Sequence, residues 1–159
     1  MNPPTSSTSY LIASIAGLQI ALPASSVKEI VRAVALGVVP GAPEILEGAL
    51  NLRGTLVPVV NLRSRLALPA RANNPSDSII VLVTDARLLA VRVESADDIE
   101  EITAENVANP STISPVLAAL QALAGVAPRE DGTLVIYDPA AFLTQAEGDA
   151  IDAALKAVS

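Results

Sequence analysis

Few side chains in this sequence could do chemistry, because it holds no histidine and no cysteine. The commonest general base, the commonest metal ligand and every thiolate are therefore missing. The acidic run Asp97–Glu101 could hold a hard cation such as Ca²⁺ or Mg²⁺. It lacks the spaced ligands and central glycine of a calcium-binding loop, so a solvated strand face is the better interpretation. We expect no catalytic residue, no metal site and no cofactor.

Composition disfavours nucleic acid as a partner. The 159 residues include 10 Lys and Arg against 17 Asp and Glu, which gives a net charge of −7. An acidic surface repels phosphate backbones. Two Tyr, one Phe and no Trp leave few side chains on which bases could stack. Charge and aromatic content therefore argue independently against nucleic-acid binding.

The N-terminal segment carries no targeting signal. Met1–Ser9 is rich in Pro, Ser and Thr and holds no Lys or Arg, so it lacks the charged start of a signal peptide. We expect it to be a disordered tail. The apolar runs of the chain fall well short of the ~18 residues that suggest a membrane span. A cytoplasmic protein without membrane insertion is the resulting expectation.

Short apolar runs separated by turn residues dominate the chain, which is typical of all-β barrels. Pro58 cannot donate to a strand ladder, so its run is expected to be an edge strand or to carry a bulge. A polar linker at 69–78 divides the runs into two similar groups, between which we find no convincing sequence repeat. The expected strands cover 10–16, 18–22, 27–34, 49–52, 55–60, 79–84, 88–93, 99–102, 126–127 and 134–137, while the apolar run 116–123 stays unassigned.

The C-terminal segment 146–159 is the clearest helix, because its later apolar residues continue one stripe. Thr144 and Glu147 have the spacing of a capping box, in which each side chain accepts a hydrogen bond from the backbone of the other residue. One helical turn at Glu44–Glu47, and a short helix or loop at Leu62–Leu68, are further expectations.

The most specific signal is Gly48-Ala-Leu-Asn-Leu-Arg-Gly54-Thr-Leu-Val-Pro-Val-Val-Asn-Leu-Arg63. It strongly resembles the signature of the CheW-like domain, in which a glycine precedes Asn-Leu-Arg-Gly and an apolar strand with a proline leads to Asp-Leu-Arg. Asn61 stands where the family usually has Asp. Ile20–Pro23, Val27–Ile30 and Val39–Pro43 match preceding family segments in the same order. The resemblance covers about residues 10–145.

This resemblance implies two small five-stranded SH3-like β-barrels, intertwined and packed side by side, with short helices and the C-terminal helix. Family members are non-catalytic adaptors that join the cytoplasmic tips of chemoreceptors to a CheA-type histidine kinase, whose regulatory domain is homologous. The chain has no His to accept phosphate and no kinase segment, so the resemblance implies a free-standing adaptor at membrane-associated receptor arrays. Two alternatives stay open: an adaptor of a non-flagellar system, such as one that controls pili, and a small-barrel module that binds peptide or nucleic acid outside chemosensing.

By the same resemblance, the partner-binding surface combines the signature turn with the strand that precedes it in the chain. Arg53 is the residue expected to couple receptor and kinase, and a structural ion pair with Glu29 is an equally good interpretation. Gly48 and Gly54 are expected where φ is positive, the alternative being the close approach of a partner backbone. The candidate residues are Val27, Glu29, Ile30, Val31, Gly48, Asn51, Leu52, Arg53 and Gly54.

The partner surfaces are expected to be apolar patches rather than charged ones. Val27, Ile30 and Val31 cannot all face the interior of one barrel, because successive residues of a strand point to opposite faces. Exposed aliphatic side chains in a cluster mark association sites. The alternative is that all three pack in the groove between the barrels.

Overall fold

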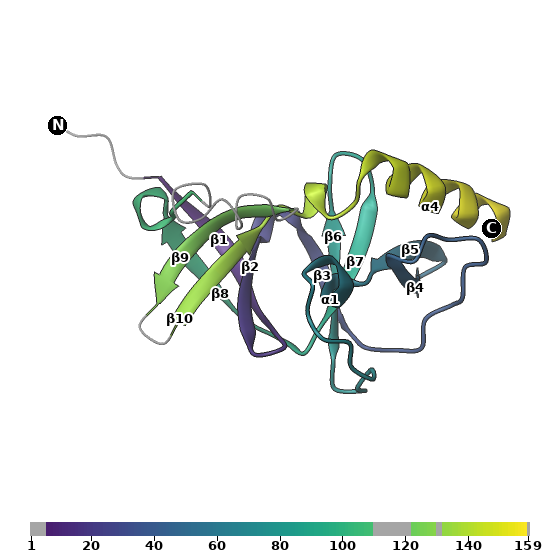
Figure 1. Ribbon diagram of the computed structural model, residues 1–159, viewed down its shortest axis with the longest axis horizontal. Coiled ribbons are helices and arrows are strands. Elements are labelled where there is room, and N and C mark those ends of the chain that lie inside the picture. The colour runs from purple at the N-terminus through teal and green to yellow at the C-terminus, as the bar shows by residue number, and fades with distance from the viewer. Residues whose placement is uncertain (1–5, 110–121, 130–131, 159) are drawn as a thin grey trace.

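The computed structural model describes residues 6–109, 122–129 and 132–158, without the side chain of Asp97. Ten strands make up about half of this part of the chain (Figure 1). They are β1 (Ser7–Ile15), β2 (Leu18–Pro23), β3 (Val27–Arg32), β4 (Leu46–Leu52), β5 (Thr55–Val60), β6 (Ser78–Val83), β7 (Leu88–Val93), β8 (Ser95–Thr103), β9 (Leu123–Arg129) and β10 (Gly132–Tyr137). The helices are α1 (Leu62–Arg65) and α4 (Gln145–Val158), and 3₁₀ turns lie at Ala24–Ser26, Ala104–Asn106 and Pro139–Ala141.

The strands form two five-stranded sheets, which lie side by side in Figure 1. The first barrel has the strand order β8-β1-β2-β10-β9, and the second has the order β3-β6-β7-β5-β4. Each sheet is closed by a short β-bridge between its two edges. In the second barrel the segment after β3 bridges to β4, and in the first barrel the segment after β8 bridges to β9. Gly37 exchanges two 2.9 Å backbone hydrogen bonds with Ala49 of β4, and Ala108 exchanges bonds of 2.7 and 3.0 Å with Val126 of β9. The expected all-β barrel architecture is confirmed.

The two barrels share one topology, but neither is made from one half of the chain. β1–β5 form the N-terminal half and β6–β10 the C-terminal half, with the linker Pro69–Asp77 between them. The first barrel takes β1 and β2 from the N-terminal half and β8, β9 and β10 from the C-terminal half, and the second barrel takes the reverse. Parallel pairing of β2 with β10 is matched by parallel pairing of β5 with β7. The linker therefore separates two topological repeats, and each barrel contains strands from both.

Alternation along the strands produces an apolar core inside each barrel and a third that the barrels share, and a small fourth cluster lies where α4 packs on the second barrel. In β6, Ile79 and Val81 face the interior of the second barrel, while Ile80 and Leu82 face a core that both barrels share. In β1, Ile12 faces the interior of the first barrel and Leu11 faces the shared core. The strands of the barrel junction are thus buried on both faces, which explains why they read as continuous apolar runs.

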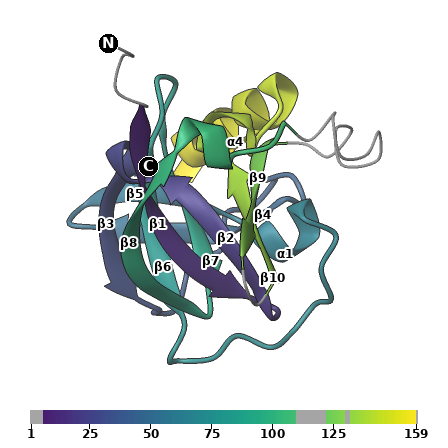
Figure 2. The same ribbon diagram turned by 90° about the vertical axis from the view of Figure 1, so that its left-hand side faces the viewer.

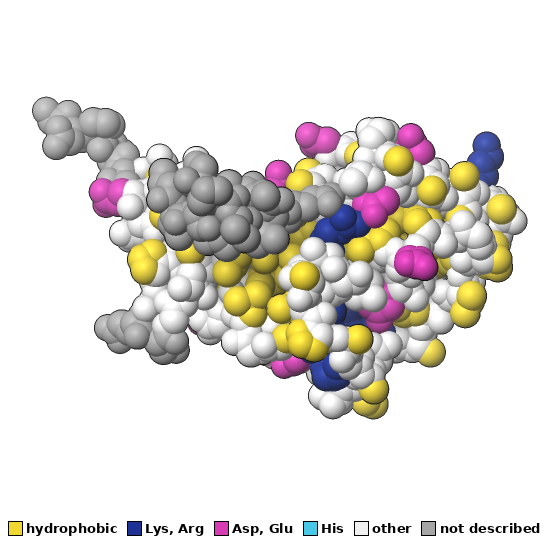
Figure 3. Space-filling view, viewed as in Figure 1, with side chains coloured by type: hydrophobic (Ala, Val, Ile, Leu, Met, Phe, Trp, Pro, Cys, Tyr) yellow, Lys and Arg dark blue, Asp and Glu magenta, His cyan; other side chains and the backbone are white. Residues whose placement is uncertain are grey.

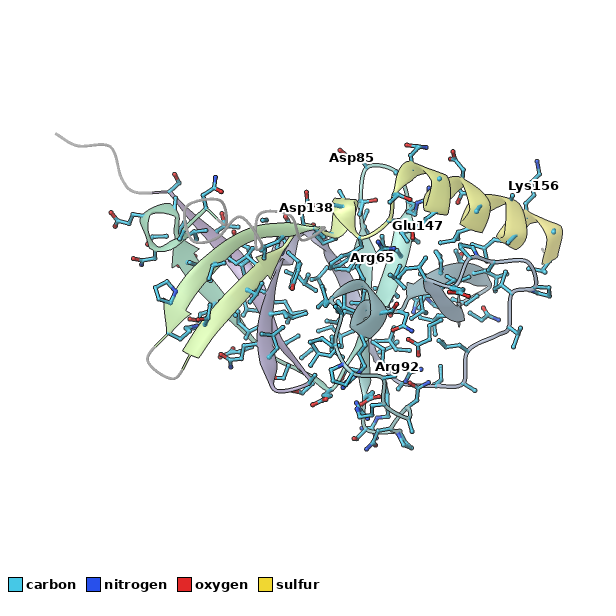
Figure 4. The ribbon with its side chains drawn as sticks, in the orientation of Figure 1. Arg65, Asp85, Arg92, Asp138, Glu147 and Lys156 are labelled. Atoms are coloured by element: carbon cyan, nitrogen blue, oxygen red, sulfur yellow. The ribbon has the colours of Figure 1, made fainter. Side chains whose placement is uncertain are left out.

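The C-terminal helix α4 covers one side of the second barrel (Figure 1 and Figure 2). The expected capping box is present, since Glu147 Oε1 accepts the Thr144 N–H at 2.8 Å and Thr144 Oγ1 accepts the Glu147 N–H at 3.1 Å. Glu147 also forms a 2.5 Å ion pair with Arg65 of α1, and the two side chains point toward each other in Figure 4. Gly148 leaves room for Arg87, because a Cβ at Gly148 would lie 2.7 Å from an Arg87 nitrogen.

Several local expectations need correction. β1 begins at Ser7 and pairs Ser7–Ser9 with β8, so these residues do not belong to a tail. Glu44–Glu47 forms no helical turn, because β4 already starts at Leu46. Pro58 lies in β5, between β4 and β7, rather than on an edge strand. Its missing N–H is tolerated because the pairing with β7 begins only at the next residue, Val59.

Some earlier expectations fall on the undescribed residues. Met1–Thr5 of the expected tail and residues 116–121 of the unassigned apolar run lie outside the described part of the chain. Within that part, neither α1 nor α4 is long and apolar enough to cross a membrane.

Cutting the linker should leave the protein assembled. With a specific protease site inserted between Ala72 and Asn73, the two pieces should co-elute after cleavage at close to the 16.3 kDa of the chain. The reason is that both sheets contain strands of both pieces. Light scattering after size-exclusion chromatography, in native buffer and in denaturant, measures the assembly. Separation of the pieces in native buffer would contradict the strand assignment.

Candidate partner-binding surface

The signature residues form the tight turn between β4 and β5. Leu52 pairs with Thr55, so Arg53 and Gly54 are the two residues of a hairpin loop. Both are left-handed, with φ of 50° for Arg53 and 91° for Gly54, as a type I′ turn requires. Asn51 Oδ1 accepts the Gly54 N–H at 2.8 Å and closes the turn. The positive φ expected for Gly54 is confirmed, and this turn presents the Arg53 side chain with 70% of its surface exposed.

Arg53 reaches from this turn to the edge strand β3. Its Nη2 lies 2.5 Å from Glu29 Oε2 and its Nη1 lies 3.3 Å from Oε1, so the ion pair is bidentate. The hydrogen bond from Arg53 holds the pKa of Glu29 below its usual value of 4.5. The contribution of the pair to stability is therefore present above that value and is lost as the pH falls through the lowered pKa. The expected Arg53–Glu29 contact is present, and it joins the β4–β5 turn to an edge strand.

β3 alternates between partly buried and exposed residues. Val27 packs against the shared core and Val31 against the interior of the second barrel, whereas Ile30 keeps 44% of its surface exposed. The expectation that these three side chains do not share one barrel interior is confirmed. Glu29 and Ile30 are successive residues of β3 and point to opposite faces of the strand. The exposed features of this edge are therefore the Arg53–Glu29 pair on one face and Ile30 on the other, and we call them together the coupling surface.

Two predicted site residues lie behind this surface rather than on it. Leu52 is 9% exposed and packs in the interior of the second barrel, so it supports the turn. Gly48 does not have a positive φ, and the expectation for that residue is wrong. A Cβ there would lie 2.8 Å from Leu36 Cβ and 2.9 Å from the Gly37 oxygen. Within the chain, the segment that closes the barrel makes this close approach.

The first barrel carries a matching ion pair that the sequence alone did not reveal. Arg129, at the end of β9, pairs with Glu100 of β8 through Nη1–Oε1 and Nη2–Oε2 distances of 2.5 and 2.7 Å. Gly125 corresponds to Gly48, because its Cβ would lie 2.5 Å from Val107 Cγ1 of the closing segment. The sequence Gly-Thr-Leu-Val occurs at both 54–57 and 132–135, but it is out of register with this equivalence by one residue, because Val57 faces a barrel interior and Val135 faces the shared core.

Most basic side chains are neutralised by neighbouring carboxylates. In the described part of the chain, seven arginines form ion pairs, namely Arg53, Arg63, Arg65, Arg71, Arg87, Arg92 and Arg129. On the face drawn in Figure 3, basic and acidic side chains lie next to one another and form no large patch of one sign. Among the described residues, no three His, Cys, Asp or Glu side chains converge as a metal site would require.

Known proteins resemble the chain over most of its length. A model of the CheW-like domain family matches residues 9–147. The chain belongs to the CheW-like domain family. The chemotaxis protein CheW of Klebsiella aerogenes is 26% identical over 114 residues, which are 72% of this chain and 68% of the relative. That of Treponema pallidum is 26% identical over 117 residues, which are 70% of this chain and 68% of the relative.

A solved member of the CheW-like family has the same fold. The scaffolding protein TtCheW from Thermoanaerobacter tengcongensis superposes with a TM-score of 0.73 at 23% identity, over 83% of this chain and 89% of TtCheW. The expected pair of small SH3-like β-barrels is thereby confirmed.

Adding a methyl group at Gly48 should destabilise the second barrel. Gly48→Ala is expected to lower the free energy of unfolding by about 1–3 kcal/mol, because the closing segment at Leu36 must move. Gly37→Ala is the matched control, since its Cβ would lie 3.7 Å from the Ala49 oxygen, at ordinary contact distance. Denaturant unfolding measures both variants. Unchanged stability of Gly48→Ala with lost partner binding would instead favour a partner backbone at this position.

Proposed function

We propose that this protein is a non-catalytic adaptor that couples the cytoplasmic tips of chemoreceptors to a CheA-type histidine kinase. Membership of the CheW-like family supports this proposal. The observation that carries it is the presentation of Arg53, the central residue of the family signature, on an exposed turn. The protein would act in the cytoplasm, at receptor arrays, with the regulatory domain of the kinase as its second partner.

The mechanism is geometric. An adaptor that holds the kinase at a fixed position against the receptor tip makes the free energies of kinase states depend on receptor state. The coupling surface suits this task because Ile30 offers apolar contact area and the Arg53–Glu29 pair offers orientation-dependent polar contacts. β6 pairs with β3 and β7 pairs with β5, so these two strands fix the position of β3 relative to the β4–β5 turn.

The ionisable groups of the described residues favour scaffolding over catalysis. Asp77 is the buried carboxylate, and burial raises its pKa, but the hydrogen bonds from Arg71 and the Asn74 N–H outweigh burial and lower it. Such a group is held ionised by neighbouring partners rather than poised to exchange a proton near neutral pH. The pairing of arginines with carboxylates likewise disfavours the alternative of a nucleic-acid module.

Removal of the Arg53 side chain should uncouple the kinase without unfolding the adaptor. Arg53→Ala is expected to lower receptor-dependent kinase activation by about tenfold or more, in the range of known coupling free energies. The melting temperature should change little, because the ion pair is exposed. Kinase activity in arrays reconstituted from receptor fragments, kinase and adaptor is the measurement.

Arg32→Ala is the matched control for this experiment. Arg32 is an exposed residue of the same strand as Glu29, so its loss makes the same change in net charge. Normal activation with Arg32→Ala and lost activation with Arg53→Ala would support a specific contact. Normal activation with both variants would refute the role of Arg53, and equal losses would point to net charge alone.

A further inference from the structure

Neither half of the chain contains a sheet of its own. Among the described residues, the ladders between named strands of the N-terminal half are the hairpins β1–β2 and β4–β5, and those of the C-terminal half are β6–β7 and β9–β10. The remaining ladders, β1–β8, β2–β10, β3–β6 and β5–β7, all join one half to the other. Each half therefore needs a complementary half to complete both barrels.

The coupling surface shows this dependence directly. Glu29 and Ile30 on β3 and Arg53 after β4 all belong to the N-terminal half. β3 does not pair with β4 or β5, because β6 and β7 of the C-terminal half lie between them in the sheet. The 2.5 Å contact between Arg53 and Glu29 thus depends on strands that follow the linker.

Only the linker Pro69–Asp77 decides which copy supplies those strands. It ends in a turn in which the Asp77 N–H donates to the Asn74 oxygen at 2.9 Å and Asp77 Oδ2 accepts the Asn74 N–H at 3.1 Å. Arg71 adds a 2.9 Å ion pair to Asp77. These contacts all lie within the linker and shape its C-terminal turn.

We propose that the complementary half can come from a second copy of this chain, in a dimer that exchanges C-terminal halves through the linker. Every contact between the halves is the same in the exchanged dimer as in the monomer, so the two forms differ only at the linker. The dimer carries two coupling surfaces, each held in shape by strands of the other copy. It is thus a tethered, bivalent form of the adaptor.

Linker length sets the balance between the two forms. A short flexible linker gives an effective local concentration of about millimolar, so the monomer dominates when dilute protein folds. Deletion of Ala70–Pro75 removes the Asn74 turn and the Arg71 ion pair and leaves three of the nine linker residues. A shortened hinge loop favours domain swapping. We expect this variant to fold mainly as the exchanged dimer.

The decisive experiment combines two tags with a cleavable linker. One full-length copy carries an N-terminal tag and the other a C-terminal tag, and both carry the protease site between Ala72 and Asn73. The copies are refolded together at low and at millimolar concentration, and dimers are isolated by size-exclusion chromatography. Cleavage should turn an exchanged dimer into two particles of monomer size, in which the N-terminal tag of one copy co-purifies with the C-terminal tag of the other.

Each outcome decides the proposal. A dimer that keeps its size after cleavage is a face-to-face dimer and overturns the proposal. Monomers alone after refolding at millimolar concentration, with the two tags never co-purifying, also overturn it. The linker deletion adds a second readout, because a folded monomeric deletion variant contradicts exchange. If the deletion variant does not fold, the refolding of the tagged full-length copies still gives the answer.

Discussion

The pairing of β3 with β6 and of β5 with β7 is the constraint on which the rest of this structure depends. These ladders join strands that lie on opposite sides of the linker. They hold β3 and the β4–β5 turn at the distance that allows Arg53 to meet Glu29. The same exchange of strands builds the first barrel, where Arg129 of β9 meets Glu100 of β8. The residues of each hairpin loop determine its turn. The distance between that turn and the edge strand of its barrel is set by strands from the other half of the chain.

Burial on two faces explains the composition of the chain. Strands at the barrel junction need apolar side chains at every position, and 51% of all residues are hydrophobic while only 2% are aromatic. Aliphatic side chains fit the narrow barrel interiors, whereas the Tyr137 and Phe142 rings, 6.0 Å apart, lie in the larger shared core. Close packing also leaves no room for a side chain at Gly48, where the closing segment crosses β4.

The sequence predicted local features well, because their signals are local. The capping box at Thr144, the hairpins and the turn at Gly54 all follow from residues a few positions apart. The intertwining of the two barrels was expected only from the family resemblance, since strand periodicity does not specify which strand is the partner. For the same reason, the steric role of Gly48 and the burial of Leu52 depend on segments that the local pattern does not identify.

Exchanging the two charges of the coupling surface tests the central claim most directly. In the double variant Glu29→Arg with Arg53→Glu, the ion pair can form again with reversed polarity, so the melting temperature should match that of the wild type. If a partner contacts the Arg53 guanidinium itself, receptor-dependent kinase activation in reconstituted arrays should remain as low as in Arg53→Ala. Full recovery of activation in the double variant would contradict this account, because the pair would then act only as a structural link between β3 and the turn.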